Sequence, residues 1–301
     1  MRVAFLGWAV NCLLCVAGVC SVAPTEAYQK VITQMQTLQQ RHPQIVSLFS
    51  IGKNDEGAEI MGMRISITPL VSDPQKVAHF IVASHHGDEK KATVFALRFV
   101  EDLIRRYSSS ELWNGQLAQT EWAVIPVLNI SGYNLGRRNE HNLDPNRDYP
   151  GPCTSHPGGA LGSIRALMNF LKGRIFTGSV TIHGFVGALT FPWGMNVENT
   201  HSLDHNPFDQ ITAKAARLNG YRYGTSTDVV HSAEGTYEDY AYLNHGLWSL
   251  LLELKDGSDS DIVQTVGAIA LYFDQLDSSP SSHNQFNTQC ARHRKPDLHI
   301  E

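Results

Sequence analysis

The segment SHHGDE, residues 84–89, combines a histidine and a glutamate at a spacing that suits metal binding. His86 and Glu89 are separated by two residues, at the point where a predicted strand passes into a predicted helix. This spacing lets an imidazole and a carboxylate converge on one cation. A chain with 14 histidines contains about one His-x-x-Glu pair by chance, so the pair needs further ligands as support.

A third ligand is expected far along the chain, at the end of another strand. His183 in GSVTIHG has such a position and precedes a glycine-containing loop. A single histidine is usually a core or surface residue, but His86 and His183 both stand where strand becomes loop, where functional sites are built. Two histidines and one glutamate leave a coordination position open for water, as in catalytic zinc sites. We therefore predict one catalytic Zn²⁺ per chain, with His85 only a neighbour.

The segment GRRNEHNLDPNRDYPG, residues 136–151, contains two arginines that could bind negative charge. Its composition is also usual for a solvated polar loop. Against that reading, Asn146 and Arg147 form an adjacent pair suited to a carboxylate, because guanidinium offers a planar fork of donors. Arg137 could meet a second need of metal-activated hydrolysis, a positive group where negative charge develops on the carbonyl oxygen.

A single carboxylate, Glu253, lies inside the apolar run LWSLLLELKDG. Burying a carboxylate in such a strand is costly unless the group is paired or used. One interpretation is an ion pair with a neighbour such as Lys255. The other is a general base with a raised pKa that takes a proton from the attacking water.

Hydrophobic periodicity predicts the elements that must position these residues. Strands are expected at 44–51, 59–66, 78–84, 121–129, 178–183 and 246–254, and helices at 26–41, 90–106, 160–172, 204–219 and 260–276, with a further helix starting near Thr236. A long loop is expected at 131–159. Alternating strands and helices predict one α/β domain, residues 24–277, with its sheet covered on both faces. The polar tail, 278–301, is expected to be loosely ordered.

The N-terminal residues have the layout of a secretory signal peptide, predicted as residues 1–23. The apolar run from Val3 to about Val22 is also near the length of a membrane span. Small residues at its end and the absence of a basic stop signal favour cleavage over a retained anchor, so we expect a secreted or periplasmic protein. Cys153 and Cys290 would remain in the mature chain, either as a disulfide or as separate thiols.

The composition excludes other classes of function. The chain has 301 residues and a net charge of -5, so it presents no basic patch for nucleic acid. It contains neither a Gly-x-Ser-x-Gly elbow nor a phosphate-binding glycine-rich loop. Nothing in the sequence indicates an oligomeric state.

In their order along the chain, these segments resemble the zinc metallocarboxypeptidase family, which includes pancreatic carboxypeptidases A and B. The branch with carboxypeptidases N, E and D is the most similar. HGDE resembles the family's His-Gly-x-Glu, SVTIHGFVGALTFPWG its third-ligand strand and loop, and HSAEGTYEDYAY its Tyr-Ser-x-Glu-Gly-x-x-x-Asp-Trp segment. The resemblance runs from about residue 27 to 275 and implies a mixed, mostly parallel sheet flanked by helices.

The resemblance also implies roles for single residues. His86, Glu89 and His183 would hold the zinc ion, and Asp144 would orient the first histidine. Arg137 would polarise the scissile carbonyl group. The substrate would be a peptide with a free C-terminal carboxylate.

Further implied roles lie in the binding of that substrate. Asn146 and Arg147 would bind the terminal carboxylate, and Glu253 would be the general base. The family's mobile tyrosine falls on His231, which can still donate a hydrogen bond, so we expect altered but retained activity.

Two positions bear on side-chain preference. The aspartate with which the N, E and D branch selects basic residues is replaced by Gly194. Glu238 lies near the family's other specificity position and could select Lys or Arg. It could equally face solvent, as charged residues usually do. Phe191 and Trp193 could instead line an apolar pocket.

Three alternative functions share parts of these motifs. A peptidoglycan-peptide carboxypeptidase would use the same zinc chemistry. An N-acyl amino acid deacylase would share His-Gly-x-Glu and Asp-x-Asn-Arg, although GTYEDY and LLELKD fit the peptidases better. An inactive binding homologue is suggested only by the loss of the tyrosine.

Overall fold

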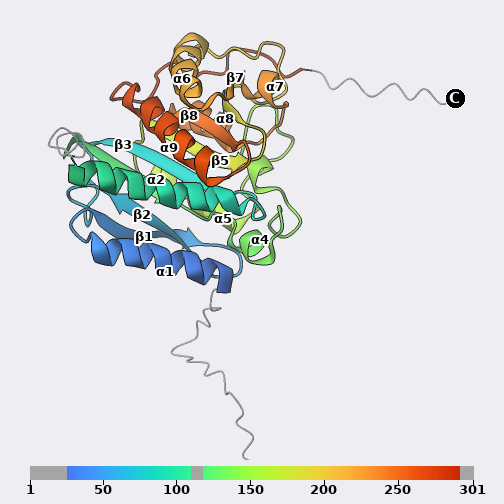
Figure 1. Cartoon of the computed structure of the whole chain (residues 1–301). Coiled ribbons are helices and arrows are strands. Elements are labelled where there is room, and N and C mark those ends of the chain that lie inside the picture. The colour runs from blue at the N-terminus through green and yellow to red at the C-terminus, as the bar shows by residue number, and fades with distance from the viewer. Residues whose placement is uncertain (1–25, 110–117, 292–301) are drawn as a thin grey trace, which may run out of the picture.

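Eight strands form one sheet at the centre of the protein (Figure 1), in the order β1-β2-β4-β3-β5-β8-β6-β7. The computed structural model describes residues 26–109 and 118–291. The strands are β1 (Val46–Lys53), β2 (Glu59–Ile65), β3 (Val77–Ala83), β4 (Thr120–Ile125), β5 (Gly178–Gly184), β6 (Ala188–Phe191), β7 (Arg222–Thr225) and β8 (Trp248–Leu254).

The centre of the sheet is parallel and its edges are mixed. β3 pairs in parallel with β4 and β5, and β5 pairs in parallel with β8, so the carboxyl ends of these strands share one edge. β1 and β2 are antiparallel, as are β2 and β4, and β6 and β8. The central strands are buried on both faces, which explains their continuous apolar sequence. The prediction of a mixed, mostly parallel sheet is confirmed.

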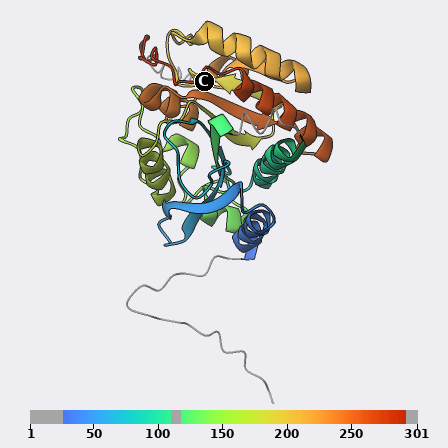
Figure 2. The same ribbon diagram turned by 90° about the vertical axis from the view of Figure 1, so that its left-hand side faces the viewer.

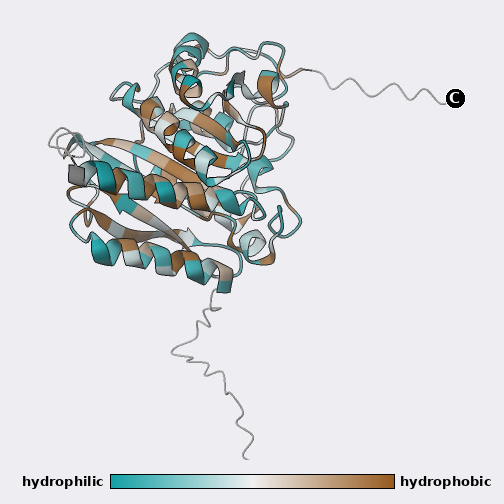
Figure 3. Ribbon diagram, in the orientation of Figure 1, coloured by the Kyte–Doolittle hydropathy of each residue, from teal (hydrophilic) through white to brown (hydrophobic). Residues whose placement is uncertain are grey.

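Helices cover both faces of the sheet, as Figure 2 shows. α2 and α9 lie on one side, and α5 and α8 lie on the other. The helices are α1 (Glu26–Arg41), α2 (Lys90–Ser109), α4 (Ile130–Leu135), α5 (Gly162–Lys172), α6 (His205–Asn219), α7 (Ser226–Val229), α8 (Tyr237–His245) and α9 (Asp259–Asp274). The hydropathy colouring of Figure 3 shows both polar and apolar residues along α1 and α2, and apolar residues along the inner strands.

Local sequence explains where these helices begin and end. α1 buries Tyr28, Val31 and Met35, which recur at helical spacing. Ser258 caps α9 by accepting a hydrogen bond from the Asp261 backbone N–H. α6 ends at Asn219 and is capped by Gly220, whose φ of 69° is easily adopted only by glycine.

The sequence-based prediction missed several short elements. The strands β6 and β7 have four residues each, too few to show a clear period. The expected loop at 131–159 begins with helix α4, because the Asn129 side chain caps it by accepting from the Gly132 N–H. A short 3-10 turn, Pro145–Arg147, follows within the same segment.

The C-terminal segment up to residue 291 is held against the body of the protein, contrary to our expectation of a loose tail. Cys290 forms a disulfide with Cys153, with the Cα atoms 5.5 Å apart, so the separate-thiol alternative is wrong. Asn287 accepts a hydrogen bond from the Trp193 indole N–H at 3.1 Å, and the Ser281 N–H donates to the Gly246 carbonyl at 2.7 Å.

The predicted signal peptide, residues 1–23, lies outside the described residues. Within residues 26–109 and 118–291, no helix combines the length and apolar character needed to span a bilayer.

Candidate active site

The three predicted metal ligands meet at the carboxyl edge of the parallel strands. His183 is near the end of β5, where it lies directly beside Glu253 in the register of β8. β3 is the other neighbour of β5, and the loop that leaves it carries His86 and Glu89. The order of the strands therefore brings together residues that are almost a hundred positions apart.

The loop from Ser84 to Glu89 is held by the segment around α4. The Asn129 side-chain amide donates to the His85 and Arg138 carbonyl oxygens, at 3.0 Å in both cases. A Cβ atom at Gly87 would lie only 2.1 Å from the Gly132 carbonyl carbon. Only glycine fits this approach, which explains the second residue of His-Gly-x-Glu.

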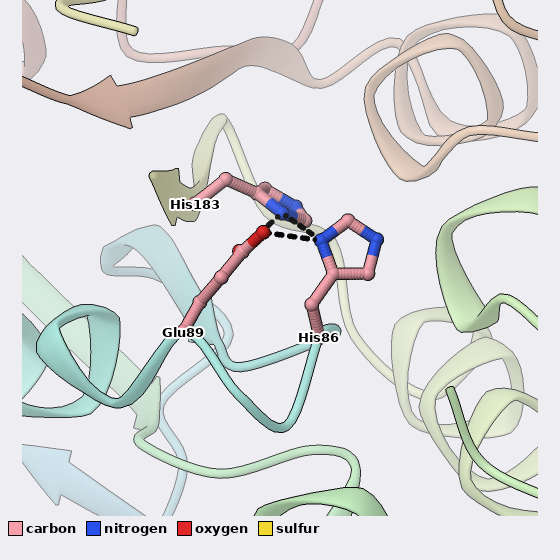
Figure 4. Close-up of side chains that lie close together, drawn as sticks. All are labelled: His86, Glu89 and His183. Carbon is pink, nitrogen blue, oxygen red and sulfur yellow. Dashed lines mark hydrogen bonds and ion pairs between the residues drawn. The ribbon is translucent and has the colours of Figure 1, made fainter. Parts of the chain in front are cut away.

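His86, Glu89 and His183 point toward one another (Figure 4), and a ligand atom from each lies within 4.8 Å of the others. Glu89 Oε1 is 2.7 Å from His86 Nδ1, and Glu89 Oε2 is 3.0 Å from His183 Nδ1. The two Nδ1 atoms are 3.1 Å apart. All three side chains are buried.

This donor set fits a zinc ion. Two imidazole nitrogens and one carboxylate converge on one point, which is the usual protein ligand set of catalytic zinc. The outer ring nitrogens are also held, since His86 Nε2 is 3.1 Å from Asp144 Oδ1 and His183 Nε2 is 3.2 Å from Thr181 Oγ1. Such outer contacts orient metal-binding histidines. The predicted partner of the first histidine, Asp144, is therefore in place.

Asp144 stays ionised in this position. Burial raises the pKa of Asp144, but the hydrogen bond with His86 and the nearby guanidinium of Arg138 outweigh burial and hold it well below its usual range. The carboxylate also caps the turn Pro145–Arg147 by accepting from the Asn146 N–H at 2.9 Å. It thereby links the metal ligands to the predicted carboxylate-binding residues.

Arg138, rather than the predicted Arg137, lines the site. Its carbonyl oxygen accepts from the Gly87 N–H at 3.2 Å, which anchors its backbone beside the ligand loop. Its guanidinium lies 3.0 Å from Asp144 Oδ2 and 3.5 Å from Glu89 Oε1. Both arginines are exposed, but Arg137 does not line the cavity, and its backbone N–H donates to the Gly132 carbonyl oxygen of α4. The structure therefore places Arg138, and not the predicted Arg137, beside the candidate metal ligands.

Asn146 and Arg147, the pair predicted to bind the terminal carboxylate, both line this cavity. Asn146 Oδ1 accepts from the Tyr237 N–H at 2.8 Å, which leaves the amide nitrogen to donate. Arg147 Nη2 is 3.3 Å from His231 Nε2. Because guanidinium can only donate, this ring nitrogen is the acceptor. Burial and the charges of Arg147 and Arg138 lower the pKa of His231, which favours its neutral form.

Glu253 faces the same cavity, whose volume is about 240 Å³. Its Oε2 atom is buried and has no hydrogen-bond partner. Burial raises the pKa of Glu253, and the negative charge of Glu89 opposes the attraction of the nearby histidines. In the part of the chain that the structure describes, Glu253 forms no ion pair with Lys255, which was the alternative interpretation of this carboxylate.

Glu238 forms part of the cavity wall with only 1% of its surface exposed, so the solvent-facing interpretation is wrong. Its Oε2 atom has no hydrogen-bond partner. Burial raises the pKa of Glu238, partly offset by Arg147, Thr236 and Asn146. Beside it, a Cβ atom at Gly194 would lie 3.4 Å from Glu238 Oε1. The same Cβ atom would lie 3.0 Å from Ser226 Cβ, so the backbone at Gly194 packs closely against this wall of the site.

Asp239 does not line the cavity but fixes the backbone of the neighbouring residues Gly194 and Met195. It accepts hydrogen bonds from the backbone N–H groups of Gly194 and Met195 at 2.8–3.1 Å. Burial and the neighbouring Glu238 raise the pKa of Asp239 to about 8. The two adjacent carboxyl groups therefore resist being ionised together.

Phe191 and Trp193 do not line the cavity, contrary to the apolar-pocket alternative. Phe191 stacks on Phe208, with ring centroids 5.3 Å apart. Trp193 packs edge-on against Tyr242 and Phe286. Both aromatic rings are fully buried, so they anchor the segment between β6 and Gly194 to the hydrophobic core.

A larger hollow of about 540 Å³ lies at the opposite ends of the strands, near Phe176 and Leu247. Its lining contains His245 but no converging set of metal ligands among the described residues. In open α/β sheets, ligands bind beyond the carboxyl ends of the parallel strands. The zinc-ligand cavity is therefore the candidate active site.

Curated carboxypeptidases align with more than half of this chain at about a quarter identity. Carboxypeptidase SOL1 of Arabidopsis thaliana is 25% identical over 241 residues, which cover 74% of this chain and 48% of the relative. Carboxypeptidase D of Rattus norvegicus is 24% identical over 185 residues, which cover 58% of this chain and 13% of that protein. The chain thus spans less than half of the length of these two relatives.

Solved structures show the same fold. The crystal structure of thrombin activatable fibrinolysis inhibitor has a TM-score of 0.73 at 18% identity, covering 83% of this chain and 74% of that one. Carboxypeptidase A of Helicoverpa armigera has a TM-score of 0.70 at 19% identity, covering 83% and 73%. The model of the zinc carboxypeptidase family matches residues 31–273, which include every residue assigned to the site. The chain belongs to the zinc carboxypeptidase family.

Proposed function

We propose that this protein is a zinc-dependent carboxypeptidase that removes single residues from peptides with a free C-terminal carboxylate. The observation that carries the proposal is the composition of one cavity. Its walls contain the predicted zinc ligands, the unpartnered carboxylate of Glu253 and the donor pair Asn146 and Arg147. An endopeptidase needs no such pair at the end of its site.

In the proposed reaction each residue acts on a definite atom. Arg147 and the Asn146 amide hold the substrate carboxylate, and Arg138 donates toward the scissile carbonyl oxygen as negative charge develops there. Glu253 accepts the proton of the attacking water and returns it to the leaving amine. A zinc ion held by His86, Glu89 and His183 would supply Lewis acidity for this hydrolysis.

His231 would change partner when substrate binds. Its Nε2 atom now accepts from Arg147, so the incoming carboxylate competes for the same guanidinium. The released ring can then bind the peptide through a hydrogen bond. This exchange supports the expectation that histidine retains a substrate-binding function at this position.

Amidation of the substrate's C-terminus tests the exopeptidase proposal. A good peptide substrate should lose essentially all cleavage when its terminal carboxylate becomes an amide, because Arg147 then loses its ionic partner. The measurement is the rate of release of the last residue from matched acid and amide peptides. Equal rates would indicate an endopeptidase or amidase. Peptidoglycan peptides and N-acyl amino acids in the same assay test the two other hydrolase functions.

We further propose that Glu238 selects a basic C-terminal residue. The buried carboxyl group of Glu238 has one oxygen without a hydrogen-bond partner, and a cationic side chain beside it would favour the ionised form that burial disfavours. Glu238→Gln should lower the ratio of kcat/KM for C-terminal Arg over Phe by at least roughly 30-fold, the low end for truncating one partner of a buried charge pair. In the wild type the ratio should rise with pH, because a carboxyl with a raised pKa ionises more fully at higher pH.

The matched control for this test is Glu234→Gln, which removes a carboxylate four residues away that does not line the cavity. It should leave the ratio unchanged. An Arg over Phe ratio that is the same in wild type and Glu238→Gln would show that Glu238 does not determine specificity.

We also propose that the protein is secreted or periplasmic. The signal-peptide layout of residues 1–23 motivates this proposal. The disulfide between Cys153 and Cys290 supports it, since disulfides persist mainly in oxidising compartments.

A further inference from the structure

A second group of potential metal ligands lies away from the zinc-ligand cavity. Asp55, in the turn between β1 and β2, comes close to Glu140 and His141 in the segment that follows α4. One ligand atom from each of these three residues lies within 4.8 Å of the others. None of the three lines the cavity described above.

Glu140 is the unusual member of this group. Its side chain is fully buried, and its Oε1 atom has no hydrogen-bond partner. The other carboxylate oxygen accepts from the Ser163 hydroxyl. Burial raises the pKa of Glu140 to about 7, so without a partner this carboxyl group tends to keep its proton, and a bound cation would let it ionise.

The surrounding charges leave this carboxylate uncompensated. The guanidinium of Arg165 binds Asp55 rather than Glu140, with Nη2 2.6 Å from Asp55 Oδ1, and its Nη1 atom donates to the Gly159 and Ala160 carbonyls. Glu56 adds a third carboxylate, with Oε1 3.6 Å from His141 Nε2. Three carboxylates therefore face one guanidinium and one histidine.

We propose that Asp55, Glu140 and His141 bind a divalent cation of the class that accepts mixed nitrogen and oxygen ligands, with Zn²⁺ as its representative. Calcium and magnesium prefer oxygen ligands, whereas an imidazole with two carboxylates suits zinc and related metals. The Asp55 carboxylate is already oriented by the Gly162 N–H, which donates to Oδ2 at 2.7 Å.

The position of the ligands gives this cation a structural role. Glu140 pairs with Leu143 in a short bridge, and His141 and Asn142 between them have positive φ values of 47° and 68°. Asp144, the partner of His86, follows directly. A cation here would tie the β1–β2 turn to the segment that carries Arg138 and Asp144, without touching the substrate.

Metal stoichiometry distinguishes this site from the catalytic one. The protein is stripped with a chelator, equilibrated with buffered Zn²⁺ and analysed for metal per chain. The wild type should bind two ions, and Glu140→Gln and His141→Ala should each bind one. His141 is exposed, so its variant remains informative if Glu140→Gln fails to fold. Exposed His201, outside both sites, provides the control His201→Ala, which should retain two ions.

A second measurement separates the two ions. His183→Ala should lose the catalytic ion, and added Zn²⁺ should still raise its melting temperature through the second site. His141→Ala in the His183→Ala background should weaken Zn²⁺ binding at the second site by at least roughly tenfold. Loss of a residue that only orients a metal ligand already lowers affinity by this factor, and His141 is proposed to be a ligand itself. A wild type with one ion, or a His141→Ala variant with two, would overturn the site. Preferential binding of Ca²⁺ would also overturn it.

Discussion

Replacement of His183 by alanine is expected to abolish catalysis and to lower the zinc content by one ion per chain. His183 Nδ1 and Glu89 Oε2 are 3.0 Å apart, and no other described side chain from β5 can replace the lost nitrogen. The remaining His86 and Glu89 form an incomplete set, and catalytic zinc sites use three protein ligands. The measurement is zinc content by elemental analysis together with turnover of a peptide substrate.

His183 is buried, so the folded state of the variant must be checked by its near-ultraviolet circular dichroism. His156→Ala is the matched control, because His156 is exposed and lies outside the ligand set. The His156→Ala variant should have the zinc content and the turnover of the wild type. Full zinc occupancy and normal turnover in a folded His183→Ala protein would disprove the metal assignment.

Replacement of Glu253 by glutamine should reduce kcat by roughly 10²–10⁴-fold while zinc stays bound, the usual range for loss of a general base. Glutamine keeps the size of the side chain but cannot accept a proton. Glu253 is suited to this role because its Oε2 atom has no partner and lies in the strand next to His183. Single-turnover kinetics and metal analysis on the same sample would measure both effects.

The control for Glu253→Gln is Asp259→Asn, which changes an acidic residue at the exposed start of α9. It should leave kcat unchanged. If Glu253→Gln retains near-normal kcat, another group activates the water and the proposed mechanism fails.

The convergence of the three candidate metal ligands could be predicted because their spacing and their places at strand ends are visible in the sequence. His86 and Glu89 follow β3, and His183 ends β5, so knowledge of a parallel sheet suffices to bring them together. Glu253 was predictable for a related reason, since a single carboxylate in an apolar strand needs an explanation.

Other features depend on contacts that no local pattern reports. Arg137 and Arg138 are adjacent and chemically equal. The bonds of Gly87 and Asn129 to the Arg138 carbonyl, which hold that residue beside the ligand loop, cannot be read from the sequence. Glu238 carries a charge and stands in a helix, which usually means exposure, yet the packing of α8 against the sheet buries it. The order of the C-terminal segment could be predicted only if the disulfide between Cys153 and Cys290 were already known.

The disulfide between Cys153 and Cys290 turns a large part of the chain into a covalent ring. The ring closes over a sequence separation of 137 residues and contains β5 and β8, with His183 and Glu253. In the chain-entropy description, such a closure disfavours the unfolded ensemble by about 5 kcal/mol. In the denatured chain the disulfide shortens the covalent path from Arg147 to Glu253, whereas the path from Arg147 to His183 runs along the chain and is unchanged. Refolding of the oxidised protein therefore begins from a chain in which the two ends of the segment 153–290 are already joined.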